Sequence, residues 1–204
     1  MTAAQRFARL VTDVVVRVPG AWRLFRRPLE RNFDRMAATW DATRVSEERL
    51  RPVRAALEAI PAAPARVVDV GTGTGAAARL AASLWPEAEI TGVDLSRAMI
   101  DEARRLASSG RERYEVADSS ALPFPDASFD AVVLNNMIPF FDELARVTAP
   151  GGHVAVAFAL GAQTPIWVPL ERVRAELERR GFAHVADFAE GIGRSLLARR
   201  PDPS

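Results

Sequence analysis

The stretch RVVDVGTGTG, from Arg66 to Gly75, constrains the fold of this 204-residue chain more than any other. Apolar residues suited to a buried strand run directly into three glycines at alternating positions, and the helix-forming run AAARLAASL follows. This order predicts a strand, a tight turn and a helix. In an open α/β sheet, a glycine-rich turn at the carboxyl end of a strand lets the backbone approach a ligand closely. The stretch therefore predicts a ligand site as well as a fold.

Beyond this stretch, strand and helix patterns alternate along the chain. The alternation predicts a parallel sheet that is covered by helices on both faces. The expected strands are residues 66–70, 89–94, 114–117, 131–134, 153–160, 183–189 and 195–199. The expected helices between them are residues 75–84, 97–107, 142–147 and 168–180, and the turn APGG precedes the fifth strand.

The region before the first strand shows apolar residues at helical spacing, first in residues 4–18 and again in residues 21–41. Pro19 and Gly20 separate these runs, and Pro28 is a candidate interruption of the second. A further helix is expected over residues 47–60, with Ser46 as its N-cap. We interpret residues 1–60 as a helical cap with a solvated arginine face, and residues 61–204 as one ligand-binding domain. Peripheral contact of the basic cap with a membrane or an acidic partner is the alternative.

Composition excludes several classes of function. The chain has no cysteine and only two histidines, so disulfides and thiolate metal sites are excluded and we expect no metal. All 27 basic residues are arginine, which removes any mechanism that needs a catalytic lysine. A net charge of +1 argues against nucleic-acid binding. No apolar run approaches the roughly 18 residues of a membrane helix and no signal-peptide pattern is present, so the expected location is the cytoplasm.

The glycines alone leave the cofactor open, because GTGTGA also satisfies the dinucleotide-binding pattern. Asp94, 23 positions after Gly71, ends the expected second strand, where a carboxylate can accept hydrogen bonds from the ribose of any adenosine-containing cofactor. A helix cap is the alternative role for Asp94, but Ser96 can fill that role. A short-chain dehydrogenase would need a tyrosine paired with a lysine. This chain has one tyrosine, Tyr114, and no lysine. Nicotinamide-dependent oxidation therefore lacks its catalyst.

Four segments in order resemble the class I S-adenosylmethionine-dependent methyltransferases: VVDVGTGTG, GVDLSRAMIDEAR, EVADSSALPFPDASFDAVV and ELARVTAPGGHVAVAF. The likeness covers residues 65–160, and FDRMAATWD is similar to the segment that precedes the first strand in such enzymes. The resemblance implies a Rossmann-like three-layer sandwich, with a mostly parallel seven-stranded sheet and one antiparallel strand. It also implies S-adenosylmethionine as the cofactor and methyl transfer to a small-molecule acceptor.

The resemblance also assigns cofactor-binding roles by position. In that family the loop of residues 69–75 lies against the methionine part and the ribose, Asp94 holds the ribose hydroxyls, and Leu95 packs on adenine. Asp118 corresponds to the carboxylate that accepts from the adenine amino group, and Asn135 to the backbone position that faces the methyl donor. Turn roles are the alternatives for these two. The expected cofactor-binding residues are Asp69, Gly71, Thr72, Gly73, Gly75, Asp94, Leu95, Asp118, Ser119 and Asn135.

The chain departs from the family pattern in the segment NNMIPFFDELARVT, which is shorter than usual and lacks a histidine often found there. No NPPY-type tetrapeptide occurs, which weakens the case for methylation of DNA or of protein amides. His153 and His184 open expected strands, at the end of the sheet opposite the cofactor, and are interpreted as structural. No catalytic residue is therefore assigned.

The acceptor side has seven candidate residues, for each of which core packing is the alternative: Trp40, Asp41, Arg44, Phe140, Phe141, Gln163 and Trp167. Their aromatic character suits a largely apolar small acceptor. A catalytically silent relative that binds the cofactor and acts as a partner subunit is the competing function. The sequence thus predicts the cofactor more closely than the acceptor.

Overall fold

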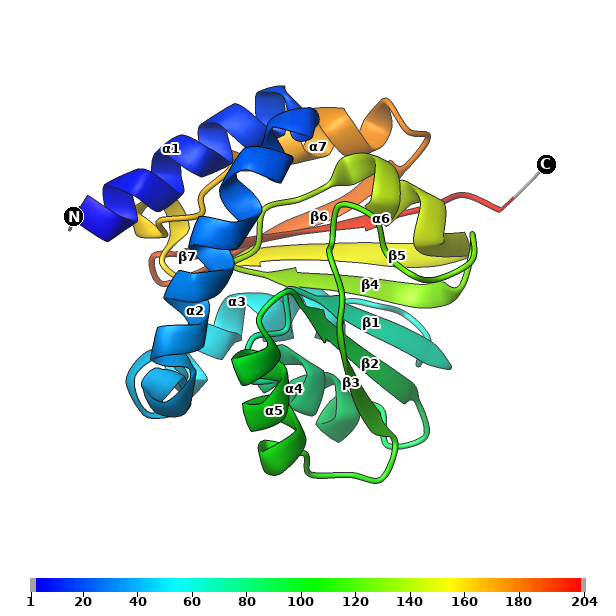
Figure 1. Ribbon diagram of the computed structural model, residues 1–204. Helices are drawn as coiled ribbons and strands as arrows, with labels where there is room; N and C mark the ends of the chain where they lie inside the picture. Colours follow the sequence, from blue (N-terminus) through cyan, green and yellow to red (C-terminus); the bar gives the residue numbers. More distant parts are fainter. Residues whose placement is uncertain (1–2, 203–204) are drawn as a thin grey trace.

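The computed structural model describes residues 3–202, which form one seven-stranded sheet between layers of helices (Figure 1). The strands are β1 (Arg66–Val70), β2 (Glu89–Asp94), β3 (Glu112–Val116), β4 (Phe129–Asn135), β5 (Thr148–Phe158), β6 (Ala183–Glu190) and β7 (Gly193–Arg199). Their order across the sheet is β3-β2-β1-β4-β5-β7-β6. β7 pairs antiparallel with β5 and β6, and the other pairs are parallel. The mostly parallel sheet with one antiparallel strand is confirmed.

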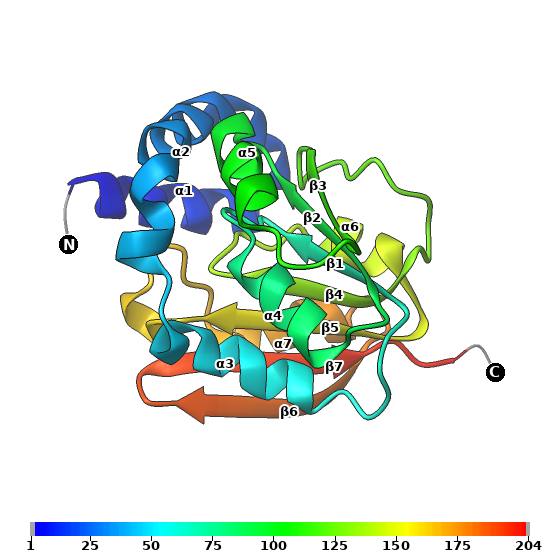
Figure 2. The same cartoon turned by 90° about the horizontal axis from the view of Figure 1, so that it is seen from below.

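Helices cover both faces of the sheet, as Figures 1 and 2 show from two directions. One face carries α3 (Glu47–Glu58), α4 (Ala76–Leu84) and α5 (Arg97–Leu106), and the other carries α6 (Phe141–Val147) and α7 (Leu170–Glu178). Successive strand residues belong to different core clusters, so Val67 packs under the first face and Val68 under the second. This two-sided burial explains why the central strands read as continuously apolar runs.

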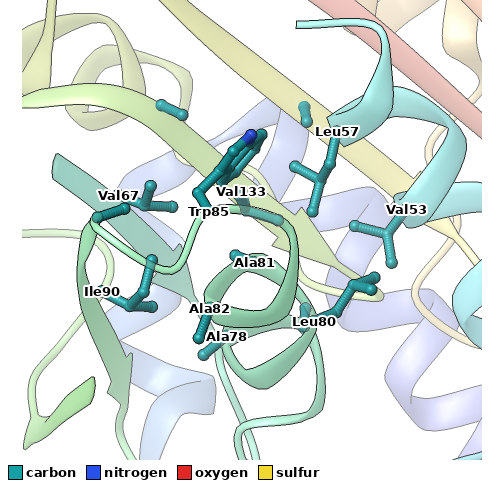
Figure 3. Packing of buried hydrophobic residues seen from close by; sticks show 14 of the residues in the cluster. Val53, Leu57, Val67, Ala78, Leu80, Ala81, Ala82, Trp85, Ile90 and Val133 are labelled. Atoms are coloured by element: carbon teal, nitrogen blue, oxygen red, sulfur yellow. The ribbon is translucent and has the colours of Figure 1, made fainter. Parts of the chain in front are cut away.

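The core under α3, α4 and α5 combines large side chains from the strands and α3 with mostly small ones, the alanines, from α4. Figure 3 shows this packing around Val53, Leu57, Val67, Ala78, Leu80, Ala81, Ala82, Trp85, Ile90 and Val133. Ala78 and Ala81 are fully buried. Because alanine side chains are short, α4 lies close to the sheet and its amino end is held directly behind the glycine turn.

The first two helices, α1 (Ala3–Arg17) and α2 (Trp22–Arg44), are joined by the 3₁₀ turn η1 (Pro19–Ala21). α2 passes across the end of the sheet at which the parallel strands finish (Figure 1). It continues through Pro28, the candidate interruption, and Trp22 and Leu29 on either side of the proline are buried. No helix in residues 3–202 is long and apolar enough to cross a membrane.

Four strands start earlier than the sequence predicts: β3, β4 and β7 by two residues each and β5 by five. β3 begins at Glu112, before the expected start at 114. β5 begins at Thr148, so the expected turn APGG lies within the strand. The backbone N–H of Gly151 donates to Arg200 and that of Arg200 donates to Gly152, which continues the pairing through this segment. His153 is consequently a buried residue inside β5, not its first residue.

Gly92, in the middle of β2, tests the packing that supports the site. A Cβ at this position would lie 2.6 Å from the ring of Tyr114 and 2.8 Å from Thr72 Oγ1. Gly92→Ala is therefore expected to lower the free energy of unfolding by about 1–3 kcal/mol, measured by urea denaturation. Gly110→Ala, at a position with no neighbour within 4 Å, is the matched control and should change it by less than about 0.5 kcal/mol. Equal stability of the two variants would contradict this account.

Candidate functional site

The turn between β1 and α4 is built from backbone with almost no room for side chains. Gly71, Gly73 and Gly75 have φ values of +74°, +54° and +84°, a region that favours glycine. A Cβ on Gly71 would lie 2.5 Å from Met137 Sδ. The N–H groups of Gly71 and Thr72 both donate to the carbonyl oxygen of Val93 on β2, at 2.8 and 2.9 Å. The turn is thereby fixed against the end of the neighbouring strand.

Asp94, the last residue of β2, faces this turn. One carboxylate oxygen accepts from the N–H of Gly73 at 2.9 Å, and the other accepts from the N–H of Ser96 at 2.9 Å. Burial raises the pKa of Asp94, and these two hydrogen bonds oppose the rise. Ser96 caps α5 through Met99, as expected for the alternative cap residue. The structure thus places Asp94 beside the glycine turn. Ser96, not Asp94, is the N-cap of α5.

Asp69 lies inside β1, 1% exposed, directly beneath the turn. Burial raises its pKa to about 6. The hydroxyl of Thr72, which donates to Oδ2 at 2.7 Å, and the backbone N–H of Ala78 lower it, whereas repulsion from Asp94 adds to the rise. Its second oxygen, Oδ1, is buried and, although the N–H of Ala78 affects the pKa of this carboxyl, accepts no hydrogen bond of normal geometry within the described chain. A buried acceptor without a donor costs about 1–3 kcal/mol, so such an atom indicates a missing partner.

Asn135, the last residue of β4, presents a second buried acceptor of this kind. Its Oδ1 has no hydrogen-bond donor among residues 3–202. The neighbouring Asn136, with φ of +58°, closes the turn instead: its N–H donates to Ala157 and its Oδ1 accepts from Ala159. Asp69 pairs with Val133 on the adjacent parallel strand β4, two residues before Asn135, so both orphan oxygens lie near the carboxyl ends of these two strands.

Asp118 follows β3, and its carboxylate is already occupied by donors of the chain. Oδ1 accepts from Trp22 Nε1 at 2.8 Å and from Ser120, and Oδ2 forms an ion pair with Arg26 at 3.3 Å. Burial would raise the pKa of Asp118, but the hydrogen bonds from Ser120, Trp22 and Arg26 hold it below its usual range. Ser119 is buried beside it.

The helix α2 is attached to this edge at two further places. Asp34 accepts from the hydroxyl of Ser96 at 2.5 Å, and Asp41 accepts from Thr74 at 2.8 Å and pairs with Arg79 at 3.2 Å. Leu95 packs against an apolar cluster made by α1, α2 and the segment after β4, namely Val11, Val15, Trp22, Leu29, Ile138 and Phe140. Sequence reasoning missed Trp22 and Arg26, whose only signal is their one-turn spacing on α2.

The candidate acceptor residues separate into three groups. Phe140 and Phe141 are buried in core clusters, and Asp41 is bound to Thr74 and Arg79. Trp40 stacks edge-on to Phe33, lies beneath Arg44 and points its Nε1 toward the position of a Cβ on Gly73, 3.8 Å away. Gln163 and Trp167 line an open cavity beside η2 (Gly161–Gln163).

Both histidines lie away from the glycine turn. His153 pairs with Ala131 and Arg199 within the sheet, and His184 on β6 contacts Asp187 at 2.9 Å. Burial and the charge of Arg199 lower the pKa of His153.

Comparison with known proteins relates this geometry to a family. A family model described as a methyltransferase domain matches residues 67–152. The chain is 34% identical over 196 residues to malonyl-(acyl-carrier protein) O-methyltransferase of Geobacter sulfurreducens. The aligned region covers 81% of this chain and 73% of that protein. It is 39% identical over 147 residues to trans-aconitate 2-methyltransferase of Methylobacterium nodulans, over 68% of this chain and 57% of that protein. The chain spans only about half the length of several curated relatives that it matches.

The fold agrees with the sequence comparison. The structure of an S-adenosylmethionine-dependent methyltransferase from Aquifex aeolicus matches with a TM-score of 0.66 at 16% identity, over 84% of this chain and 98% of that one. A chain that matches such enzymes in sequence across its glycine turn, and in fold across its sheet, belongs to the class I S-adenosylmethionine-dependent methyltransferases, whose cofactor is S-adenosylmethionine.

Proposed function

We propose that this chain transfers the methyl group of S-adenosylmethionine to a small-molecule acceptor. The observation that carries the proposal is the pair of buried oxygens without donors, Asp69 Oδ1 and Asn135 Oδ1, at the carboxyl ends of adjacent strands. The amino group of the cofactor's methionine part supplies both N–H donors and a positive charge. Its N–H groups therefore suit the two unsatisfied oxygens, and its charge suits the buried carboxyl of Asp69.

The remaining cofactor contacts are proposed from the same edge. Gly71, Thr72, Gly73 and Gly75 would cradle the methionine part and the ribose, where only backbone leaves enough room. Asp94 would accept from the ribose hydroxyls with lone pairs that its two backbone hydrogen bonds leave free. Leu95 would pack on the adenine ring, and Asp118 and Ser119 would border the adenine amino group.

When bound, the cofactor supplies a methyl group on a positively charged sulfur, and methyl transfer leaves a neutral thioether. The side chains of this protein then have to align the acceptor and keep water away from the reacting atoms. The apolar cluster under α1 and α2 is suited to exclude water from this edge. We assign no general base, because His153 and His184 both lie away from it.

Methyl transfer itself is tested with labelled S-adenosylmethionine and a panel of small metabolites, with DNA and unfolded protein as further acceptors. Transfer to one or more small molecules, and none to the two polymers, is the expected result. Tight binding of S-adenosylhomocysteine without transfer to any acceptor would instead favour the catalytically silent partner subunit. Binding of NAD in preference to S-adenosylhomocysteine in calorimetry would exclude both.

Asp94→Ala tests the ribose contact. Loss of the two hydroxyl acceptors is expected to weaken S-adenosylhomocysteine binding at least about tenfold in calorimetry, since hydrogen bonds to a charged group contribute about 1.5–3 kcal/mol. Asp101→Ala, which removes an exposed carboxylate on α5, is the matched control and should bind normally. Circular dichroism and thermal unfolding establish that both variants are folded. Unchanged affinity of a folded Asp94→Ala variant would show that Asp94 does not bind the ribose hydroxyls.

Asp69 predicts a pH dependence of binding. Its pKa of about 6 means that roughly half of the molecules carry the proton at pH 6. A cation placed beside the carboxyl favours the ionised form, so binding should release up to about half a proton at pH 6, and affinity should rise between pH 5 and pH 7. Calorimetry in two buffers of different ionisation enthalpy measures this release. Asp69→Asn should abolish it, whereas proton uptake by the wild type would contradict the proposal.

A further inference from the structure

The cavity beside η2 and the β6–β7 turn has a volume of about 290 Å³. It lies where β5 ends and β7 begins, since Phe158 pairs with Arg194. Figure 2 shows the segment after β5 and the β6–β7 turn at the same end of the sheet. The cavity is close in size to the smaller ligand sites of proteins, which start at roughly 300 Å³.

Two parts of the chain are held together to form the walls of this cavity. Gly161, with φ of +50°, lets η2 approach the turn so closely that a Cβ would lie 2.2 Å from the carbonyl oxygen of Ile192. Arg9 of α1 donates to the carbonyl oxygen of Ala162 within η2 and to that of Thr164 directly after it. These contacts fix the loop, so the cavity is a built feature and not a gap between mobile segments.

The walls are mostly apolar. Trp167 stacks edge-on to the buried Phe158, with ring centroids 5.0 Å apart, and also lines the cavity. Leu160 and Ile192 line it as well, and Ile192 is 52% exposed at the tip of the turn. A large aliphatic side chain exposed beside an indole ring provides a surface on which an apolar or aromatic body can pack.

One charged side chain, Arg194, interrupts this apolar lining. Its Nη1 donates to the carbonyl oxygens of Gly191 and Gly193, at 2.9 and 2.7 Å, which holds the guanidinium in place. A guanidinium carries five N–H groups, so three are left without a hydrogen bond within the described chain. Arg194 also has no acidic partner among residues 3–202. A fixed cation with free donors is a binding group for a carboxylate.

The cavity adjoins the edge at which the methyl donor is proposed to bind. Asn135 on β4 pairs with Ala157 on β5, and the cavity begins three residues later at Leu160, roughly 10 Å along the chain. The N–H of Ala159 donates to Asn136, which connects the two ends directly. An elongated molecule could therefore reach from Arg194 toward the methyl position.

We propose that this cavity is the acceptor subsite, and that the acceptor carries an anionic group, a carboxylate, on an apolar or aromatic body. The carboxylate pairs with Arg194, the body packs on Trp167 and Ile192, and the far end of the molecule is the methylated one. The assignment rests on the proposed methyl transfer. It adds the chemical class of the acceptor and the residue that selects it.

Binding is tested by ligand-observed NMR and calorimetry on the full chain, with arylalkanoates and alkanoates of six to twelve carbons, each compared with its primary alcohol. At least one acid is expected to bind at least about tenfold more tightly than its alcohol. Arg194→Gln should reduce this difference to less than about threefold. Arg113→Gln, an exposed arginine on β3 at the other side of the sheet, is the matched control and should keep it.

Ala162→Phe tests whether the ligands bind in this cavity. A ring at this exposed lining residue fills the cavity and should weaken binding of acid and alcohol alike. The proposal is overturned if no acid binds more tightly than its alcohol, or if Arg194→Gln keeps the preference. Titrations with and without saturating S-adenosylhomocysteine separate the two claims. Binding of an acid by a chain that does not bind S-adenosylhomocysteine would reject the proposed function and leave the anion site standing.

Discussion

At the end of β1 the backbone approaches its neighbours so closely that it determines where the other parts of the site lie. Side chains from β3 and from the segment after β4 occupy the space where a Cβ would lie: Met137 lies over Gly71, and Tyr114 lies over both Gly75 and Gly92. Because the backbone and these side chains pack without spare room, the ends of β1, β2 and β4 lie close together in one small region. The acidic and amide side chains at those ends then face the same ligand.

Three aspartates at neighbouring strand ends show how local surroundings give one residue type different properties. Burial raises the pKa values of Asp69 and Asp94, whereas donors from Ser120, Trp22 and Arg26 lower that of Asp118. Asp69 keeps an unsatisfied oxygen, while Asp118 is fully engaged with α2. Asp69 is thus arranged to receive a donor and a positive charge, and Asp118 anchors the helix that covers the edge.

Local patterns predicted most of the sheet and the position of Asp94 beside the glycine turn, because strand, turn and helix signals lie within a few residues of one another. They did not predict the contacts of Trp22 and Arg26 with Asp118, which join residues more than 90 positions apart. The sequence predicted only some of the residues that line the cavity. Gln163 and Trp167 were candidates, whereas Ile192 and Arg194 were not, because only the pairing of β5 with β7 brings them close. Phe140 and Phe141 were aromatic candidates that the core absorbs. The division of the chain at residue 60 stays a prediction, and α3 packs under the sheet with α4.

A crystal structure of the chain with S-adenosylhomocysteine would show whether the unpaired oxygens at this edge bind the cofactor. The ligand is expected at the carboxyl ends of β1, β2 and β4, with its ribose hydroxyls on the Asp94 carboxylate and its amino group within hydrogen-bond distance of Asp69 Oδ1 and Asn135 Oδ1. A ligand bound at another edge, or bound here with both of those oxygens still unpaired, would contradict it.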